Sequence, residues 1–313
     1  MIAIPGRTVA LSSLLALATC LQPAMAQDDN GGNKEVQHKT KDPHDTASPT
    51  AGSTGSQTPL ITYHNGPVMA MPNVYLIWYG NWNQSNGSDN AQGQQIVRDF
   101  LYGLSGSPYY TINSSYPGVS GKISVAGEYT DTGSQGTRLS DSRVQAVVSS
   151  AIASGRLGGP DTNGLYFVLT SSNVSESSGF CTQYCGWHTA GTISGSNIKY
   201  SFVGNANRCL SACAAQTTSP NGNAGVDGMI SVIAHELEET NTDPNPRSGW
   251  ADSNGAENGD KCAWTFGSHQ TLLNGAYYNM TLPTKSGPPR NYLVQRNLAS
   301  DSKCYIDYVT KAQ

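Results

Sequence analysis

A histidine and three glutamates lie within five consecutive residues of this chain, at His235, Glu236, Glu238 and Glu239. The cluster stands out because only 13% of the residues are Asp, Glu, Lys or Arg. On a helix, residues 235 and 239 project from one face, since they are four positions apart. An imidazole and a carboxylate so placed can hold Zn²⁺, and Glu236 can act as general base on water bound to the metal. This is the H-E-x-x-H metallohydrolase pattern with glutamate replacing the second histidine.

Such a metal ion needs further protein ligands, and the segment 250–262 offers three carboxylates soon after the helix. Glu257 is the expected third ligand. Asp260 is expected either to orient an imidazole or to bind the metal itself. His188 and Asp252 are two further candidates for the site, although a single histidine outside a motif is more often structural.

Simpler interpretations of these carboxylates remain open. Acidic residues are common on solvated helices, although three at a C-terminal end repel one another and oppose the helix dipole. The loop carboxylates could form an all-oxygen calcium site, but they lack the EF-hand spacing. An anionic ligand in place of histidine makes the ion a poorer Lewis acid and widens the choice to Mn²⁺, Fe²⁺ or Ca²⁺. The sequence therefore predicts metal binding, with Zn²⁺ as the main expectation and Ca²⁺ as the alternative, more strongly than hydrolysis.

The first residues have the features of an export signal. Arg7 precedes an apolar run over residues 9–21, and a small-x-small triplet follows at 24–26. The run is too short to span a bilayer, and no later segment is long enough to do so. Residues 17–20 resemble a lipobox, but threonine before the cysteine fits poorly. We therefore expect a signal peptide over residues 1–26 and a secreted protein, either extracellular or periplasmic.

The composition changes after the signal peptide. Residues 27–58 are polar and hold Val36 as their one large aliphatic side chain. Such a segment buries too little apolar surface to offset the entropy of ordering its backbone, so it is expected to be a disordered linker. Residues 59–313 are then one domain. The net charge of −4 argues against nucleic acid or anionic membrane as partners. The sequence does not predict an oligomeric state.

Six of the seven cysteines lie in the expected domain, which in an exported chain indicates three disulfides. Spacing favours Cys181–Cys185, Cys209–Cys213 and Cys262–Cys304 among the 15 pairings that six cysteines allow. The last of these would close the longest loop and stabilise the domain most, by about 3–4 kcal/mol. A zinc site of four thiolates, made by the two C-x3-C pairs, is the alternative.

Periodicity predicts seven main elements in the order β-α-β-α-β-β-α. The expected strands are 74–79, 122–129, 165–169 and 200–203, and the expected helices are 94–104, 140–154 and 227–239. We expect Ser140 or Asp141 to cap the second helix and Asp227 the third. The remainder is loop-rich with short strands. The fold class is therefore α/β to α+β, a layered mixed sheet with a zincin-like metal helix and a disulfide-stapled C-terminal part.

Several separated motifs occur together over residues 60–305. They are Tyr63-His64-Asn65-Gly66-Pro67, Val74-Tyr75-Leu76-Ile77-Trp78-Tyr79-Gly80, Gly179-Phe180-Cys181, Cys185-Gly186 with His188, Val203-Gly204-Asn205, Val226-Asp227-Gly228-Met229, Ala234-His235-Glu236-Leu237 with Glu239, and Glu257 with Asp260 and Cys262. In this order they resemble the phosphate-induced protein or EXORDIUM family, and the chain is similar to its bacterial members. The resemblance implies an extracellular protein with a zincin-like helix, and it implies no substrate. Plant members are secreted to the cell wall space and are associated with growth.

Two functional hypotheses follow. The first is an exported metal-dependent hydrolase, a zinc metallopeptidase-like enzyme acting on peptides. In it His235, Glu239 and Glu257 bind the metal and Glu236 is the general base. The second is a secreted, non-catalytic protein that binds a cell-wall polymer or glycan, or signals, and uses a metal only for stability. Tyrosines and tryptophans would then provide stacking surfaces for sugars.

Overall fold

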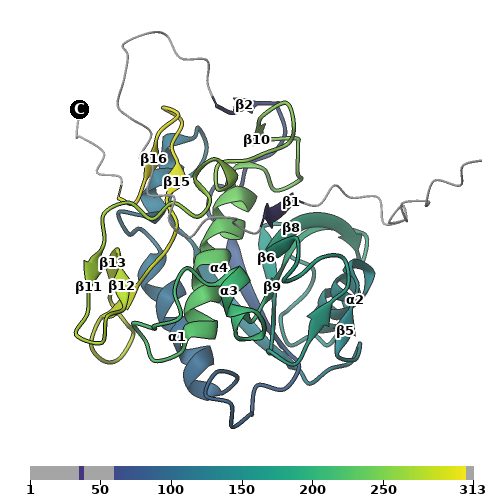
Figure 1. The fold of residues 1–313 in the computed structure, drawn as a ribbon. Coiled ribbons are helices and arrows are strands. Elements are labelled where there is room, and N and C mark those ends of the chain that lie inside the picture. The colour runs from purple at the N-terminus through teal and green to yellow at the C-terminus, as the bar shows by residue number, and fades with distance from the viewer. Residues whose placement is uncertain (1–34, 39–59, 308–313) are drawn as a thin grey trace, which may run out of the picture. The chain divides into compact units, whose positions relative to one another are not determined.

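The computed structural model describes residues 35–38, of which only the backbone is considered, and residues 60–307. The expected signal peptide and most of the expected linker lie outside the described residues. A six-stranded sheet organises the chain, in the order β1-β8-β9-β6-β3-β4 (Figure 1). Its strands are β1 (Glu35–His38), β3 (Asn73–Tyr79), β4 (Ser124–Asp131), β6 (Gly164–Thr170), β8 (Tyr184–Ile193) and β9 (Ser196–Gly204).

Four of these strands run parallel, and the two at one edge run antiparallel to their neighbours. The parallel strands are β9, β6, β3 and β4, while β8 pairs with both β9 and β1 in antiparallel register. Every residue of β6 is buried, as are all but the first of β3. Their continuous apolar sequences suit strands that are covered on both faces.

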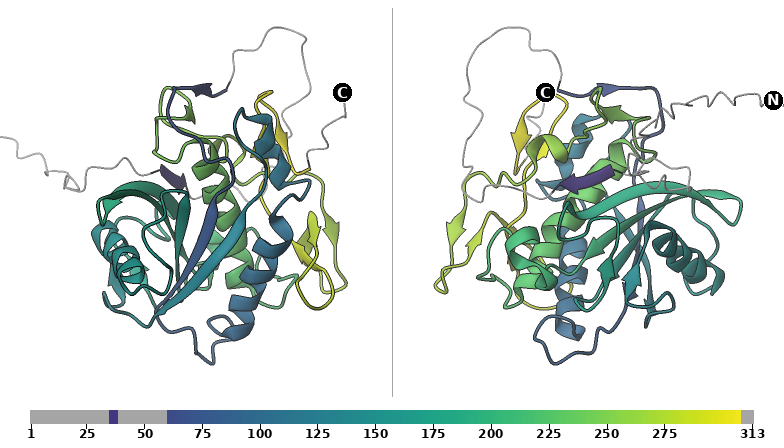
Figure 2. Two further views of the ribbon diagram at one scale, coloured as in Figure 1. Left: turned by 180° about the vertical axis from the view of Figure 1, so that it is seen from behind. Right: turned by 45° about the vertical axis from the view of Figure 1, so that its right-hand side comes forward.

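Helices cover both faces of the sheet. Helix α1 (Ala91–Leu104) connects β3 to β4, and helix α2 (Asp141–Ala153) connects β4 to β6. The two connections run in opposite directions along the sheet, so right-handed crossovers place the helices on opposite faces. Figure 2 shows α2 on one side of the sheet and α1 with α4 on the other. The predicted cap of the second helix is confirmed, because the Ser140 side chain accepts a hydrogen bond from the Arg143 amide.

Helix α4 (Ala224–Thr242) lies against β8 and β9 on one side and α1 on another. It begins earlier than predicted, with Asn223 as its N-cap. Asp227 does not cap it and instead accepts hydrogen bonds from Ser219 and Asn221. The residues from 228 to 242 are buried on every side of the helix, which includes its charged ones. The helix therefore carries its glutamates into the interior rather than to a solvated surface.

Short elements complete the described chain, and the C-terminal part is loop-rich, as predicted. The short strands are β2 (Thr62–Tyr63), β5 (Arg138–Leu139), β7 (Ser175–Glu176), β10 (Trp250–Ala251), β11 (Gln270–Thr271), β12 (Tyr277–Tyr278), β13 (Met280–Leu282), β14 (Arg290–Tyr292), β15 (Asn297–Leu298) and β16 (Cys304–Tyr305). The short helices are α3 (Leu210–Cys213) and the 3-10 turns η1 (Tyr110–Ser115), η2 (Ala206–Arg208) and η3 (Asp260–Cys262). Within residues 60–307, no helix is long and apolar enough to cross a bilayer.

The disulfide pairing is partly different from the prediction. Cys262–Cys304 is confirmed, but the other bonds join Cys181 to Cys209 and Cys185 to Cys213. Cys209 directly precedes α3 and Cys213 ends it, and both meet the facing segment before and within β8. With all six sulfurs in disulfides, the proposed four-thiolate zinc site is wrong. The two parallel links instead fix α3 to the start of β8.

The expected linker contains one described strand. The backbone of β1 pairs with β8, with Glu35 opposite His188 and Gln37 opposite Gly186. Backbone pairing with an open sheet edge can order a polar segment that has little apolar surface, and the disorder of the linker stays a prediction.

Candidate metal centre

Three segments bring the predicted metal ligands together. Helix α4 provides His235, Glu236 and Glu239, and the turn that leads into η3 provides Glu257 and Asp260. Strand β8 adds His188, whose ring lies against the carboxylates of both other segments. Sequence reasoning named His188 only as a secondary candidate, because a single histidine outside a motif is more often structural. The structure makes it a central member of the site.

Two glycines allow these segments to approach. A Cβ atom on Gly186 in β8 would lie 2.5 Å from Val232 of α4 and 3.1 Å from the Glu236 carboxylate. A Cβ atom on Gly259 would lie 2.8 Å from Glu239 Oε1 and 2.9 Å from His235 Nδ1. Both positions therefore exclude any side chain. These close backbone approaches are a part of the site that the sequence analysis missed.

The distances between polar atoms in the centre fit shared metal ligands better than hydrogen bonds. His188 Nε2 lies 3.6 Å from Glu239 Oε2 and also 3.6 Å from Glu257 Oε2. His235 Nε2 lies 3.7 Å from Asp260 Oδ1. These separations are too long for hydrogen bonds. Two ligands of one tetrahedral ion, each about 2.1 Å from it, lie about 3.4 Å apart.

Glu239 faces both imidazoles. Its Oε1 atom lies 2.9 Å from His235 Nε2, a close approach without hydrogen-bond alignment, and accepts a hydrogen bond from the Asp260 amide at 3.0 Å. Its Oε2 atom accepts no hydrogen bond from the described residues. Neither ring nitrogen of His188 has a hydrogen-bond partner among them either. Buried polar atoms without hydrogen-bond partners reduce the stability of the fold, so this set of nitrogen and oxygen atoms fits a cation in the centre.

The centre is shielded from solvent. The side chains of His188, His235 and Glu239 have no exposed surface, and that of Asp260 is 11% exposed. Burial, with His235 as a further cause, lowers the pKa of His188 to about 3. Burial first, and then the neighbouring Asp260 carboxylate, raises the pKa of Glu239 well above its usual value. His188 is therefore a neutral imidazole at neutral pH, which is the form that binds metals.

Gln295 supports His235 from the side away from Glu239. Its amide nitrogen lies in hydrogen-bond contact with His235 Nδ1, and its amide oxygen accepts from the Trp264 backbone amide at 3.2 Å. With the Gln295 amide nitrogen as the donor, Nδ1 is the acceptor and the ring proton lies on Nε2. Metal binding through Nε2 requires the amide to turn over, so that its oxygen accepts from Nδ1 instead.

Two acidic residues from the candidate segments do not join the centre. Glu238 faces a different side of α4, where it accepts a hydrogen bond from Tyr109 at 3.1 Å, and burial raises its pKa well above the usual value. Asp252 forms an ion pair with Lys261 and accepts hydrogen bonds from two backbone amides of its own loop. That pairing disfavours the alternative of a calcium site centred on Asp252.

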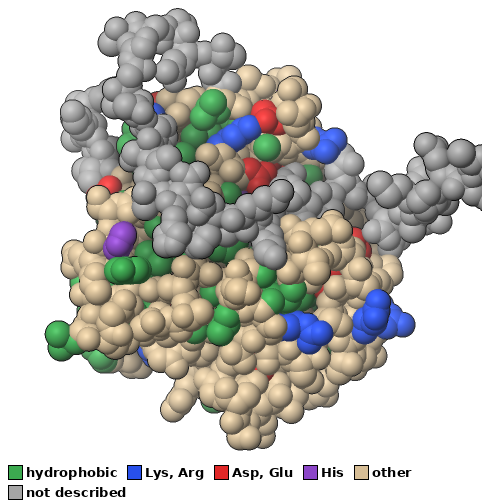
Figure 3. All heavy atoms as spheres, viewed as in Figure 1, with side chains coloured by type: hydrophobic (Ala, Val, Ile, Leu, Met, Phe, Trp, Pro, Cys, Tyr) green, Lys and Arg blue, Asp and Glu red, His purple; other side chains and the backbone are tan. Residues whose placement is uncertain are grey.

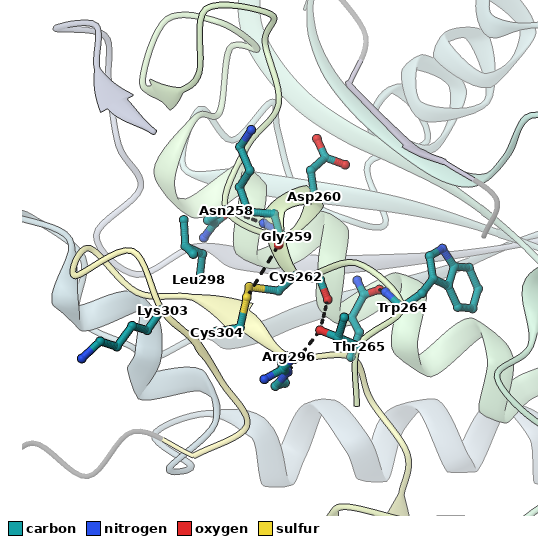
Figure 4. The surroundings of a disulfide bond; sticks show 12 residues. Asn258, Gly259, Asp260, Cys262, Trp264, Thr265, Arg296, Leu298, Lys303 and Cys304 are labelled. Carbon is teal, nitrogen blue, oxygen red and sulfur yellow. Dashed lines mark hydrogen bonds between the residues drawn. A yellow bond between two sulfur atoms is a disulfide. The ribbon is translucent and has the colours of Figure 1, made fainter. Parts of the chain in front are cut away.

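The Cys262–Cys304 disulfide holds in place the turn that carries Glu257 and Asp260. Figure 4 shows Gly259 and Asp260 on the same turn as Cys262, which is bonded to Cys304. Cys304 Sγ also contacts the Lys261 carbonyl at 3.6 Å. The disulfide thus connects the ligand turn to β16 near the end of the described chain.

The fold and site define a layered α/β protein that encloses a cluster of two imidazoles and four carboxylates. The chain belongs to the phosphate-induced protein 1 family, because the model of the Phosphate-induced protein 1 conserved region matches residues 61–281. The resemblance inferred from the motifs is therefore confirmed at the level of the family. That the chain is a bacterial member stays a prediction.

Curated plant proteins are similar over most of the chain. Protein EXORDIUM-like 3 from Arabidopsis thaliana is 33% identical over 284 residues, which cover 75% of this chain and 79% of the relative. Protein EXORDIUM-like 5 from the same plant is 32% identical over 267 residues, covering 74% and 70%. Protein PHOSPHATE-INDUCED 1 from Nicotiana tabacum is 28% identical over 224 residues, covering 59% and 65%. No solved structure matches the chain.

Proposed function

We propose that this chain is an exported, non-catalytic binding or signalling protein of the EXORDIUM type, whose buried centre holds a structural divalent cation. The single observation that carries the proposal is the complete burial of the imidazoles and of Glu239. A catalytic metal needs an open coordination position that a substrate can reach. A closed ligand set is instead typical of metals that stabilise a fold.

The ligand types indicate which cation suits the centre. Imidazole favours zinc or iron over calcium, which prefers oxygen ligands alone. Zn²⁺ therefore remains the main expectation, with His188, Glu239 and Glu257 as the ligands whose geometry supports it best. Three disulfides support export, because such bonds persist in oxidising compartments.

A cell-wall polymer or glycan is the proposed partner. Tyr63, Tyr102 and Tyr277 are each about half exposed, and Tyr63 stacks on Trp250 with ring centroids 5.4 Å apart. Aromatic rings presented in this way can stack on sugar rings. On the face shown in Figure 3, Lys and Arg side chains are scattered singly, which agrees with a partner that is not nucleic acid.

Two measurements on the purified protein test this proposal. Metal analysis should find a divalent cation in the wild type and markedly less in His188→Ala. Sedimentation with insoluble wall polysaccharide should retain the wild type and Glu236→Gln equally but Tyr63→Ala less. Equal retention of the Tyr63 variant would remove the stacking surface from the proposal, and absence of metal would remove the structural cation.

A metal-dependent hydrolase is the second candidate, and the position of Glu236 favours it. Its carboxylate belongs to the same group of potential ligands as His188 and Glu239, on a helix with the zincin-like HExxE pattern. In an enzyme, Glu236 would take a proton from the attacking water and pass it to the leaving group. Cleavage of a peptide library by the wild type, abolished in Glu236→Gln, would establish this function and overturn the non-catalytic one.

A further inference from the structure

The two carboxylate oxygens of Glu239 point to two different imidazoles. Oε1 lies 2.9 Å from His235 Nε2, and Oε2 lies 3.6 Å from His188 Nε2. A carboxylate that served a single ion would place both oxygens, or only one, toward that ion. Glu239 instead has the arrangement of a carboxylate that bridges two ions.

Each imidazole belongs to its own group of potential ligands, and Glu239 is a member of both groups. His188 is grouped with Glu236 and Glu239, and it lies 3.6 Å from Glu257. His235 is grouped with Glu239 and Asp260. Within each group the potential ligand atoms lie within 4.8 Å of one another, and Glu239 is the residue that the groups share.

The charge of the centre also matches two cations rather than one. Four carboxylates carry a total charge of −4 when ionised, and the two imidazoles are neutral when they bind metal. One divalent cation would leave two negative charges in a buried region, whereas two cations balance them. An uncompensated charge in the interior is strongly destabilising.

We propose that the centre binds two divalent transition-metal ions, with Glu239 as the bridging ligand. This inference rests on the proposed function only in requiring that the centre binds metal. Two imidazoles with four carboxylates is the ligand set that di-iron and di-manganese proteins use in an unrelated helical fold. Such ions lie about 3.5–4 Å apart, which a single carboxylate can span.

The two positions should fill in order. Both ring nitrogens of His188 are without a hydrogen-bond partner among the described residues, so the first ion meets an imidazole that is already available to bind it. The second ion needs His235 Nε2, which becomes available only when the Gln295 amide turns over. The position beside His188 is therefore the tighter one, and the position beside His235 and Asp260 the weaker one.

Titration of the metal-stripped, full-length protein tests the proposal. Native mass spectrometry and calorimetry with Zn²⁺ should show two ions bound in two steps. With Mn²⁺, electron paramagnetic resonance should show the magnetic coupling of two ions that share a bridging ligand. Asp260→Asn should remove the weaker step and the coupling while leaving the tighter step within about threefold.

Asp252→Asn is the matched control, because Asp252 lies in the same loop but is paired with Lys261 outside the centre. It should keep both steps. Binding of one ion only, with no coupling, would overturn the two-ion centre but leave the structural cation of the proposed function intact. Binding of no ion to a protein with native circular dichroism would overturn both.

Discussion

Two sites in this protein bury carboxylates, and they differ in how the buried negative charge is stabilised. One is the candidate metal centre, where His188 of β8 meets the carboxylates of α4 and of the turn around η3. The other, which we call the Asp89 cluster, consists of Asp89 with Gln84, Asn86, Ser172 and Asn205, at the carboxyl ends of the parallel strands. The Asp89 side chain has no exposed surface, as is also true of Glu239.

In the Asp89 cluster, neutral groups donate hydrogen bonds to the buried carboxylate. Asp89 accepts hydrogen bonds from the side chains of Gln84, Asn86 and Asn205, and from both the amide and the hydroxyl of Ser172. In the candidate metal centre, Glu239 accepts a hydrogen bond from one backbone amide and otherwise faces imidazoles and carboxylates. Acceptors gathered without donors require a cation, whereas acceptors gathered among amides and hydroxyls do not. The following changes should separate the two sites.

The largest effect is expected from metal removal. A chelator should destabilise the wild type by at least about 4 kcal/mol, the linkage energy at a thousandfold excess of ligand over its dissociation constant. Scanning calorimetry should record a fall in Tm of roughly 8–16 °C for a domain of this size. Added Zn²⁺ should restore the original value. A Tm that does not respond to the chelator would contradict the contrast drawn between the sites.

Removal of the Asp89 carboxylate should have the next largest effect. Asp89→Ala leaves several buried donors without an acceptor, so the free energy of unfolding should fall by about 3 kcal/mol. Denaturant titration measures this loss. Metal content and the shift caused by a chelator should match those of the wild type, because no residue of this cluster contacts the centre. A chelator-insensitive variant would mean that the two sites are coupled.

A matched pair of glycine substitutions sharpens the comparison. Gly259→Ala places a Cβ atom against Glu239 and His235, and Gly93→Ala places one 2.4 Å from the Ser88 carbonyl, beside the Asp89 cluster. Each should cost about 1–3 kcal/mol by overpacking. Only Gly259→Ala should also lower zinc affinity, by about tenfold or more in calorimetry. Equal zinc affinity in both variants would show that the centre tolerates displacement of its ligands.

The smallest expected effect is the pH dependence of the metal-stripped protein. The raised pKa values of Glu238 and Glu239 mean that the folded state binds more protons than the unfolded state above about pH 4.5, so stability falls as pH rises. The lowered pKa of His188 has the opposite effect between pH 6.5 and about 3, where stability falls as pH decreases. Above pH 6.5 and into the alkaline range, the carboxylate effect acts without the opposing effect of His188.

Thermal melts of the stripped protein should therefore show Tm declining by a few degrees over that alkaline range. The metal-loaded protein should show a smaller decline, because Glu239 is then ionised and bound to the cation, whereas Glu238 lies outside the centre and still titrates. A parallel decline in both forms would mean that the titrating groups lie outside the centre.

Much of the fold followed from local sequence patterns. The seven predicted elements occur as β3, α1, β4, α2, β6, β9 and α4, with boundaries that differ by a few residues. Long apolar runs and helical periodicity identify such elements because their burial depends on their own sequence. Strand β8 was missed, since its Cys-Gly-Trp-His-Thr sequence has neither regular alternation nor a high content of β-branched residues.

The centre was predictable to a similar extent. The i, i+4 relation of His235 and Glu239 and the nearby carboxylates at 257 and 260 could be read directly, because they depend on helix geometry and short chain distances. The role of His188 depends on a strand distant in the sequence. The disulfide pairing was predicted wrongly at two of three bonds, because pairing depends on which segments become neighbours in space.

The sequence by itself determined the family, the helix that carries the acidic cluster and the residues able to bind a metal. Those features depend on the local spacing of residues and on short motifs. Only the tertiary structure decided that the cluster is buried, that His188 completes it and that Glu239 lies between two imidazoles. The reason is physical: burial and long-range contacts arise from how β8, α4 and the turn before η3 pack together, and no single segment contains that information.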